Sequence, residues 1–296
     1  MITSPIVAVV TPFDAKGAVD KGALRDYLAL LADAGVTTIL VNGTTGEFFS
    51  MTSRERGAVL EFCREHWSGQ IIAHIGATAI GDAIDLLDHA RSHADYLAAI
   101  SPYFYASPPE EGVCAYFRQL LAQSDLPLLL YNFPRHAQTD ITPSIVSRLA
   151  AEFPLLRGVK DSGTDRGITR RFKAARPDMQ VFIGDDRAGT HLAKIGADGL
   201  VTGNGGPVVE LPLRIADAVT GDDLQRAHRL QADFDQWNDA RHASSLTEIA
   251  FTKAALAARL PGFPLSVRPP LVSATDSQSQ EIRSFLHRTM MPLLNP

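Results

Sequence analysis

The stretch Leu155-Leu156-Arg157-Gly158-Val159-Lys160-Asp161-Ser162-Gly163 is a largely apolar run that ends in a lysine and then breaks into turn residues. Pro154 and Gly163 flank the run, and its shortness fits a strand covered on both faces better than a helix. Strands buried on both faces belong to parallel sheets, whose strands are connected by helices. The stretch therefore predicts an α/β protein, and its lysine needs an explanation.

The chain has six lysines, and Lys160 alone ends an apolar run. Apolar neighbours disfavour the charged form of an amine, and a neutral amine attacks a ketone to form a Schiff base. The alternative is a lysine that extends from a strand end to solvent. The other five are expected in polar or helical contexts where the ammonium reaches water: Lys16, Lys21, Lys173, Lys194 and Lys253.

Strand-like and helix-like runs alternate along the chain on both sides of this stretch. Helix starts are indicated by a capping box from Thr52 to Glu55 and by Thr142 followed by Pro143, and Gly35 ends the first helix. The expected strands are residues 6–10, 36–41, 71–75, 96–100, 128–131, 155–160, 181–184 and 200–202.

This repeat of strand and helix favours a (β/α)8 barrel, which right-handed crossovers between successive parallel strands would close. A doubly wound sheet is the alternative, but the first strand-to-helix turn, residues 11–17, is not a glycine-rich phosphate fingerprint. We expect the barrel to occupy residues 1–221 and to carry the active site, with Pro207 at the start of its eighth helix.

Beyond the barrel, residues 222–296 are expected to form a C-terminal helical domain packed on it. One helix should run to about His242 and another should begin at a capping box from Ser245 to Glu248. A last helix should begin at about Ser277.

Composition limits the classes of partner. The chain of 296 residues is 45% hydrophobic and 21% charged, with a net charge of -5, so we expect a globular protein that binds a small molecule rather than nucleic acid or a membrane. Residues 1–11 have no basic segment and too short an apolar run for a signal peptide or a membrane span, which predicts a cytoplasmic location. Cys63 and Cys114 lack CxxC spacing and are interpreted as core residues.

The active site of such a barrel lies at the C-terminal ends of its strands. Tyr131 and Lys160 end neighbouring strands, so a phenol and an amine are expected within contact distance. The tyrosine hydroxyl can carry the protons that imine formation requires. The Gly-Thr-Thr-Gly turn at 43–46 offers hydroxyls and backbone N–H groups to the carboxylate of a 2-oxo acid, the alternative being a turn that only connects strand and helix.

Two further polar residues follow strands, His74 and Asp185, and each is interpreted as satisfying local backbone groups rather than acting in catalysis. No His, Asp or Glu cluster has the spacing of metal ligands, so a metal-dependent aldolase is not expected. No cofactor is expected either.

Three motifs, in this order and spacing, resemble the dihydrodipicolinate synthase and N-acetylneuraminate lyase family of class I aldolases: Gly43-Thr44-Thr45-Gly46-Glu47, Tyr131-Asn132-Phe133-Pro134 and Gly158-Val159-Lys160-Asp161. The resemblance runs the length of the chain. It implies that Lys160 forms a Schiff base with a 2-oxo acid such as pyruvate and that Tyr131 relays protons. The family is commonly tetrameric, which implies a homotetramer built as a dimer of dimers, or a homodimer.

By position, the resemblance also implies roles for the turn and for the last strand. Thr44 and Thr45 should bind the substrate carboxylate, with Thr45 in the hydroxyl relay and Gly46 in the same substrate-binding turn. Val201 should line the site.

The sequence departs from the synthases of the family at two places. Phe104 stands where a synthase tyrosine reaches into the partner subunit, and whether Tyr103 or Tyr105 compensates is left open. His136 stands where a synthase arginine binds the carboxylate of the second substrate, and Arg135 precedes it. A neutral histidine is a weak substitute for a bidentate guanidinium.

These observations favour a Schiff-base lyase, an aldolase or dehydratase, that acts on a 2-oxo acid, and a 2-oxo-3-deoxy sugar acid in particular. Pyruvate is the expected product or donor. One alternative is the synthase proper, which joins pyruvate to an aldehyde. Another is a regulatory barrel that binds a 2-oxo acid without catalysing a reaction, because fold does not determine function.

Overall fold

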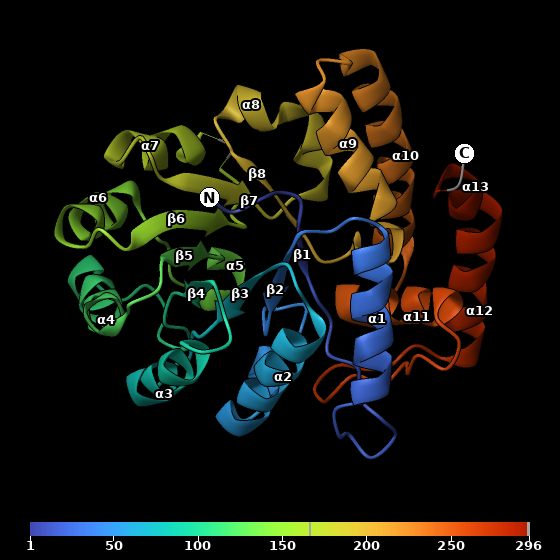
Figure 1. Ribbon diagram of the computed structural model, residues 1–296, viewed down its shortest axis with the longest axis horizontal. Coiled ribbons are helices and arrows are strands. Elements are labelled where there is room, and N and C mark those ends of the chain that lie inside the picture. Colours follow the sequence, from blue (N-terminus) through green and yellow to red (C-terminus); the bar gives the residue numbers. More distant parts are fainter. Residues whose placement is uncertain (166, 295–296) are drawn as a thin grey trace.

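The computed structural model of the protein describes residues 1–165 and 167–294. Within them, eight parallel strands form a closed barrel in chain order, and β8 pairs with β1. Figure 1 shows these strands surrounded by helices, so the (β/α)8 barrel is confirmed. The strands are β1 (Ile6–Ala8), β2 (Thr38–Val41), β3 (Gln70–His74), β4 (Tyr96–Ile100), β5 (Leu128–Asn132), β6 (Leu156–Asp161), β7 (Gln180–Ile183) and β8 (Gly199–Thr202).

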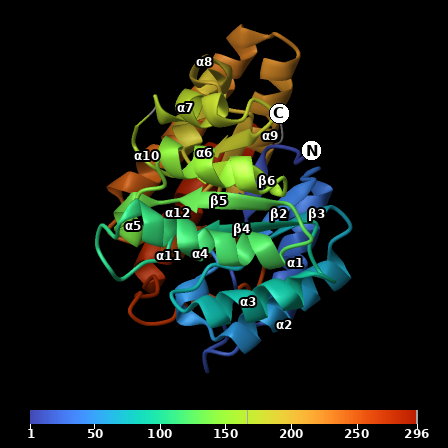
Figure 2. The same ribbon diagram turned by 90° about the vertical axis from the view of Figure 1, so that its left-hand side faces the viewer.

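Helices connect the strands and cover the outside of the barrel. The capping box from Thr52 to Glu55 and the cap at Thr142 are both formed. Figure 2 shows α3, α4 and α6 side by side along the strands. The connecting helices are α1 (Lys21–Asp33), α2 (Ser53–His66), α3 (Ile80–Ala90), α4 (Glu110–Gln123), α5 (Pro134–Ala137), α6 (Pro143–Glu152), α7 (Ile168–Ala175), α8 (Leu192–Ile195) and α9 (Glu210–Thr220).

Successive residues of each strand alternate between two apolar layers, as the two-residue period of a strand requires. On β1, Ile6 and Ala8 belong to the cluster inside the barrel, whereas Val7 belongs to the larger cluster between strands and helices. On β6, Val159 lies in that outer layer, so the next residue, Lys160, faces the interior of the barrel.

The C-terminal residues form helices that pack beside α9. Figure 1 shows them in orange and red on one side of the barrel. Their core includes Phe234, Trp237 and Phe251 together with Leu211 and Ile215 of α9, so the last helix of the barrel shares its core with the tail. The helices are α10 (Leu224–Ala243), α11 (Glu248–Arg259), α12 (Asp276–Phe285) and α13 (Met291–Leu294). The division into two domains at residue 221 stays a prediction.

Two expected helix starts were wrong. Thr247, and not Ser245, caps α11, because its hydroxyl accepts a hydrogen bond from the backbone N–H of Ala250 at 3.4 Å. The Ser245 hydroxyl instead accepts a hydrogen bond from Gln278 of α12. Pro207 lies in a short 3-10 turn, and the eighth barrel helix begins after it.

The expectation that Lys253 reaches water was also wrong. The Lys253 side chain is 0% exposed, and its ammonium lies 2.5 Å from a carboxylate oxygen of Glu47, which is equally buried. Burial lowers the pKa of Lys253 to about 8, although the nearby carboxylate acts in the opposite direction. Helix α11 is buried along most of its length, so its sequence offers no solvent-facing side that would reveal the lysine.

Arg268 joins the C-terminal segment to the start of α2 through an ion pair with Glu55, 2.5 Å long. This guanidinium lowers the pKa of Glu55 from its ordinary value of 4.5 to about 2. A carboxyl whose pKa is lower in the folded state contributes stability above its unfolded pKa and loses it as the pH falls through the folded one. We therefore expect the destabilisation caused by Glu55→Gln to be fully present at pH 6 and to shrink between about pH 4.5 and 2.

Urea unfolding of both proteins at a series of pH values measures this difference. Glu65→Gln, which changes an exposed residue of the same helix, is the matched control and should show a small difference at every pH. A destabilisation by Glu55→Gln that is the same at pH 6 and pH 3 would contradict the prediction.

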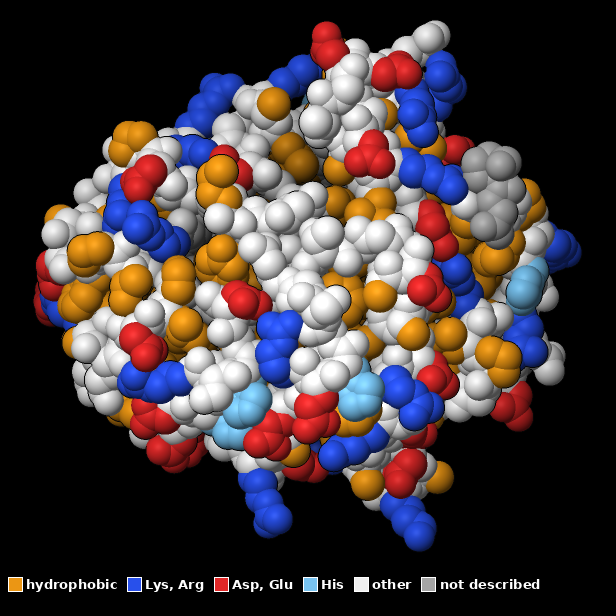
Figure 3. Space-filling model, in the orientation of Figure 1, with side chains coloured by type: hydrophobic (Ala, Val, Ile, Leu, Met, Phe, Trp, Pro, Cys, Tyr) orange, Lys and Arg blue, Asp and Glu red, His pale blue; other side chains and the backbone are white. Residues whose placement is uncertain are grey.

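On the face seen in Figure 3, lysine and arginine side chains alternate with acidic ones rather than gathering into one basic patch. None of the helices formed by residues 1–165 and 167–294 is long and apolar enough to span a membrane.

Candidate active site

Lys160 and Tyr131 lie side by side at the C-terminal ends of β6 and β5. The strand register pairs the two residues directly, and both side chains are buried, Lys160 with 7% exposure and Tyr131 with 2%. The Lys160 Nζ lies 3.6 Å from the centroid of the Tyr131 ring. The alternative of a lysine that extends to solvent does not fit this geometry, because the amine is held against an aromatic face inside the protein.

The residues that follow each of them point the other way and hold the two strands together. Asn132 Nδ2 donates a hydrogen bond to Asp161 Oδ1 at 2.7 Å, and Asn132 Oδ1 accepts one from the backbone N–H of Ile141. Burial raises the pKa of the Asp161 carboxyl. This pair therefore fixes the spacing of the strand ends that carry the phenol and the amine.

Two further residues lie beside the amine: Ser162, which was missed in the sequence, and Gly184, the last residue of the strand expected at 181–184. Ser162 Oγ accepts a hydrogen bond from Lys160 Nζ at 3.0 Å. Gly184, after β7, leaves space for both, because a Cβ there would overlap with Ser162 Oγ and lie 3.5 Å from Lys160 Nζ. The spacing of two residues between Lys160 and Ser162 was the available signal, since alternate residues of an extended segment share a face.

The turn at residues 43–46 brings its first threonine to the phenol. Thr44 Oγ1 and the Tyr131 hydroxyl form a hydrogen bond of 3.0 Å. The Thr45 side chain lies against Gly203, where an added Cβ would overlap with it. The resemblance placed Thr45 in the hydroxyl relay, but Thr44 is the threonine that contacts the tyrosine.

Gly46 lies in the turn after β2, and Val201 lies on β8. The Gly46 carbonyl accepts a hydrogen bond from Thr11 Oγ1 at 2.8 Å, and its N–H closes the turn on the Gly43 carbonyl. Val201 lies on β8 among the apolar side chains inside the barrel.

Helix α5 places His136 and Arg135 at the edge of the site. His136 stacks on Phe133, with ring centroids 4.0 Å apart, and Phe133 in turn stacks on Tyr131. Burial and the cations of Arg135 and Lys160 lower the pKa of His136, so its imidazole is neutral at neutral pH. The Arg135 and His136 side chains are both exposed.

His74 is a structural residue, as the sequence suggested. Its Nδ1 lies 2.9 Å from the Asn42 carbonyl, and its Nε2 accepts a hydrogen bond from the backbone N–H of Ile100. Burial and the Arg56 guanidinium hold its pKa well below the ordinary value. A neutral ring with both nitrogens bound to the backbone has no group left for proton transfer.

Asp186 carries a carboxyl with a raised pKa, a feature that the sequence did not single out. It follows β7, the strand beside β6, and burial raises the pKa of its carboxyl to about 7, although a hydrogen bond from Thr202 acts in the opposite direction. The side chains that act on its pKa are Thr202, Glu248, Arg241 and Arg187, and neither Lys160 nor Tyr131 is among them. Its neighbour Asp185 caps the following 3-10 turn through the backbone N–H of Arg187.

The three aromatic residues after β4 divide between the site and the surface. Tyr103 packs with Phe48 in the cluster that contains Tyr131. Phe104 and Tyr105 are 83% and 77% exposed, and Phe104 has a left-handed φ of 91°. Within one subunit, Tyr103 is therefore the aromatic of this segment that packs with the candidate site.

Across the described parts of the chain, no group of three or more His, Cys, Asp or Glu side chains is placed to hold a metal ion. Cys63 and Cys114 are buried, free thiols, as interpreted from the sequence.

The chain matches known proteins over nearly its whole length. The model of the dihydrodipicolinate synthetase family matches residues 1–289. A 4-hydroxy-tetrahydrodipicolinate synthase of Symbiobacterium thermophilum is 31% identical, with 95% of this chain and 96% of the relative covered. A probable 2-dehydro-3-deoxy-D-pentonate aldolase of Escherichia coli is 29% identical, with 95% of each chain covered.

A solved structure with the same fold is a variant of the 2-keto-3-deoxygluconate aldolase of Sulfolobus solfataricus, in complex with L-2-keto,3-deoxy-galactonate. It has a TM-score of 0.88 and 25% sequence identity, and the match covers 98% of this chain and 97% of that one. The chain therefore belongs to the dihydrodipicolinate synthetase family, whose members are class I, aldolase-type lyases.

Proposed function

We propose that Lys160 is the Schiff-base lysine of this lyase and that Tyr131 relays the protons of the reaction. The observation that supports this most strongly is the buried amine 3.6 Å from the Tyr131 ring, whose hydroxyl is bonded to Thr44. A nucleophile beside a proton carrier that is itself oriented by a third group is the usual arrangement for covalent catalysis.

The first step joins the amine to the 2-oxo acid. The Nζ lone pair forms a bond to C2, the C2–oxygen bond breaks, and the oxygen leaves as water with one proton from the amine and one supplied through Tyr131. The product is an iminium ion. Ser162, whose hydroxyl lies 3.0 Å from Nζ, keeps the amine directed into the barrel.

The iminium then accepts the electron pair of the C3–C4 bond of a deoxy sugar acid. The C4 hydroxyl loses its proton as an aldehyde forms, and the resulting enamine takes a proton at C3. Water hydrolyses the imine and releases pyruvate. Each of these proton transfers requires a group that both gives and takes protons, which a tyrosine hydroxyl in a hydroxyl chain provides.

The turn at 43–46 receives the substrate carboxylate in this proposal. The N–H groups of Gly46 and Glu47 donate to the carbonyls of Gly43 and Thr44 within the turn. The carboxylate is then met by the Thr45 hydroxyl and by the N–H groups of Thr44 and Thr45, while the Thr44 hydroxyl serves Tyr131.

For the second part of the substrate we propose a 2-oxo-3-deoxy sugar acid. The relative from Escherichia coli is named as an aldolase for such a compound, and the Sulfolobus aldolase was solved with one. The neutral His136 supports this choice, because sugar hydroxyls can be met by neutral groups whereas a second carboxylate calls for a cation.

The synthase reaction is the second candidate, favoured by the relative from Symbiobacterium thermophilum, which at 31% identity is named as a synthase. It would require Arg135 to bind the carboxylate of the aldehyde. Arg135 and His136 are both exposed on the short helix α5.

Reduction with borohydride in the presence of pyruvate tests the covalent step. The hydride converts the imine into a stable secondary amine, and mass mapping then identifies the modified peptide. Pyruvate should be found on the peptide that contains Lys160 and on no other.

The choice of substrate gives a second measurable expectation. A lost charge-assisted contact costs about 1.5 to 3 kcal/mol, or roughly tenfold to over a hundredfold in affinity. We therefore expect kcat/KM for cleavage of 2-oxo-3-deoxy sugar acids to exceed that for condensation of pyruvate with aspartate semialdehyde. His136→Arg should reduce the ratio of these two kcat/KM values. Steady-state kinetics with a panel of both substrate classes measures this.

Arg135→Ala is the matched variant for the panel, since it removes the neighbouring cation and leaves His136 in place. If aspartate semialdehyde were the best partner and Arg135→Ala abolished its use, the synthase candidate would be correct.

We also propose that the enzyme is cytoplasmic and works as a homotetramer, a dimer of dimers, or as a homodimer. Exposed Phe104 and Tyr105, which contact each other edge to face at 5.4 Å, support an interface between subunits at this segment. Light scattering of the purified protein tests the oligomeric state.

A further inference from the structure

Glu47, the residue after the carboxylate-binding turn, is both buried and strained. Its side chain is 0% exposed, and its φ of 58° lies in the left-handed region that favours glycine. A buried carboxylate needs a counter-charge and hydrogen bonds, and a left-handed non-glycine residue persists only when its surroundings determine its conformation. The partners of Glu47 should therefore reveal why the chain keeps it there.

Those partners come from the opposite end of the chain. Lys253 Nζ lies 2.5 Å from Glu47 Oε1, and the backbone N–H of Arg268 donates to Glu47 Oε2 at 2.9 Å. The Lys253 ammonium also donates to the Ser266 carbonyl at 2.7 Å. The C-terminal helices thus contact the catalytic face of the barrel through this carboxylate.

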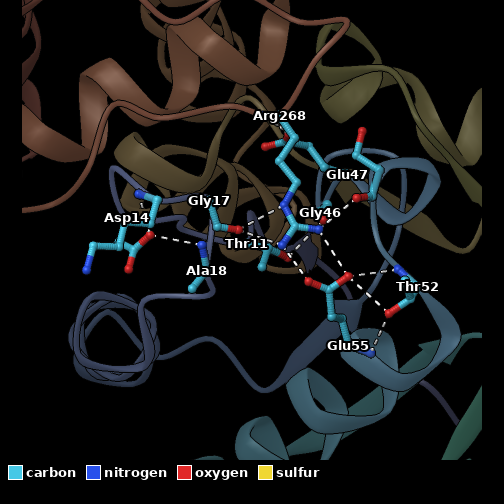
Figure 4. Close-up of polar contacts among 11 residues, drawn as sticks. Thr11, Asp14, Gly17, Ala18, Gly46, Glu47, Thr52, Glu55 and Arg268 are labelled. Carbon is cyan, nitrogen blue, oxygen red and sulfur yellow. Dashed lines mark hydrogen bonds and ion pairs between the residues drawn. The ribbon is translucent and has the colours of Figure 1, made fainter.

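The Arg268 side chain fastens the loops around Glu47. Figure 4 shows its guanidinium between the Gly17 carbonyl and the Glu55 carboxylate, with Glu47 beside it. The same guanidinium donates to the Ser50 carbonyl at 2.7 Å, just after Glu47 in the chain. The segment that follows the turn is therefore held from both sides.

A short chain of bonds joins Glu47 to the reacting groups. The Glu47 N–H donates to the Thr44 carbonyl at 3.0 Å, and the Thr44 hydroxyl bonds to Tyr131 at 3.0 Å. A displacement of the Glu47 backbone would thus move both threonines of the turn relative to Lys160.

We propose that Lys253 is a positioning residue for the substrate carboxylate. Through Glu47, it keeps the turn at 43–46 in the position where the bound carboxylate places the reacting carbon beside Lys160. This inference rests on the proposed function, since it presumes that the turn receives a carboxylate. The alternative is that the ion pair only attaches the C-terminal helices to the barrel.

The same helix offers a matched control for attachment. Arg259 of α11 forms an ion pair of 2.8 Å with Glu210 of α9, with both side chains largely buried. This pair also joins the C-terminal helices to the barrel, but at the outer helix layer and away from the turn. Arg259→Met therefore weakens attachment without touching the proposed relay.

The experiment measures how borohydride trapping depends on pyruvate concentration in the full-length protein. Lys253→Met is expected to raise the concentration for half-maximal trapping at least tenfold and to change the trapping rate at saturation less than threefold, because binding of the carboxylate is impaired while the amine is intact. Arg259→Met should lower Tm and keep the half-maximal concentration within twofold of the wild type.

Lys253→Met leaves a buried carboxylate without its counter-charge, which can prevent folding. The double variant Glu47→Gln/Lys253→Met removes both charges and should fold, again with at least a tenfold higher half-maximal concentration. A double variant within twofold of the wild type, or an equal shift in Arg259→Met, would overturn the inference. Wild-type protein that gives no adduct on Lys160 would overturn the proposed function, and this inference with it.

Discussion

Lys160→Ala is expected to abolish trapping of pyruvate by borohydride and to lower kcat by more than about 10⁴-fold, because loss of the nucleophile leaves only the binding effects of the site. The fold should survive the change. The variant loses an amine that is costly to bury but also the apolar stem of the side chain, and these two effects on stability oppose each other. The far-ultraviolet circular dichroism spectrum should therefore match that of the wild type, with only a small change in Tm.

Lys194→Ala is the matched control, because Lys194 is exposed on α8. The Lys194→Ala protein should form the borohydride-trapped pyruvate adduct at the wild-type rate. An adduct found on Lys194 or Lys253, or trapping that persists in Lys160→Ala, would show that another amine is the nucleophile.

Tyr131→Phe is expected to lower kcat by about 10²- to 10⁴-fold, the usual contribution of a general acid–base group. Phenylalanine keeps the ring on which the Lys160 amine lies, and it deletes only the hydroxyl that bonds to Thr44. Single-turnover rates of imine formation, measured with the purified variant, separate this effect from a change in substrate binding.

Tyr27→Phe is the control for the loss of a buried tyrosine hydroxyl, since Tyr27 lies on α1 and packs against Phe263. Its activity should stay within threefold of the wild type. A loss below tenfold in Tyr131→Phe would mean that Tyr131 acts through its ring alone.

The sequence predicted the barrel and the central pair of residues for physical reasons. Buried parallel strands are short apolar runs, so a lysine or a tyrosine at the end of one stands out. Neighbouring strands of a closed barrel bring their ends together, and the register indeed pairs Tyr131 with Lys160. The same reasoning could have found Ser162, two residues beyond Lys160.

Other features could not be predicted from the pattern. Thr44 and Thr45 are adjacent in a turn, and spacing does not tell which hydroxyl reaches Tyr131. The same limit applies to Asp185 and Asp186, because the 3-10 turn that separates their roles has no strong sequence signal.

Lys253 is the clearest example of a residue whose surroundings could not be predicted from the sequence. A helix buried on most sides does not reveal from its period which polar residue is buried, and the partner of Lys253 is 206 residues away in the chain. Pairings of that kind depend on tertiary packing.

The pairing of Lys253 with Glu47 also affects when this part of the protein can fold during synthesis. Synthesis delivers the turn at 43–46 early, whereas the ammonium and the backbone N–H that hold Glu47 belong to residues 253 and 268. Until the ribosome has released residues 253 and 268, the Glu47 carboxylate of a nascent barrel has no counter-charge and has to stay in water. The turn at 43–46 then lacks the contacts that hold Glu47. The contacts that hold Glu47 can therefore form only after residues 253 and 268 have been synthesised, and a chain that terminates before them carries Lys160 without the ion pair that holds the neighbouring turn.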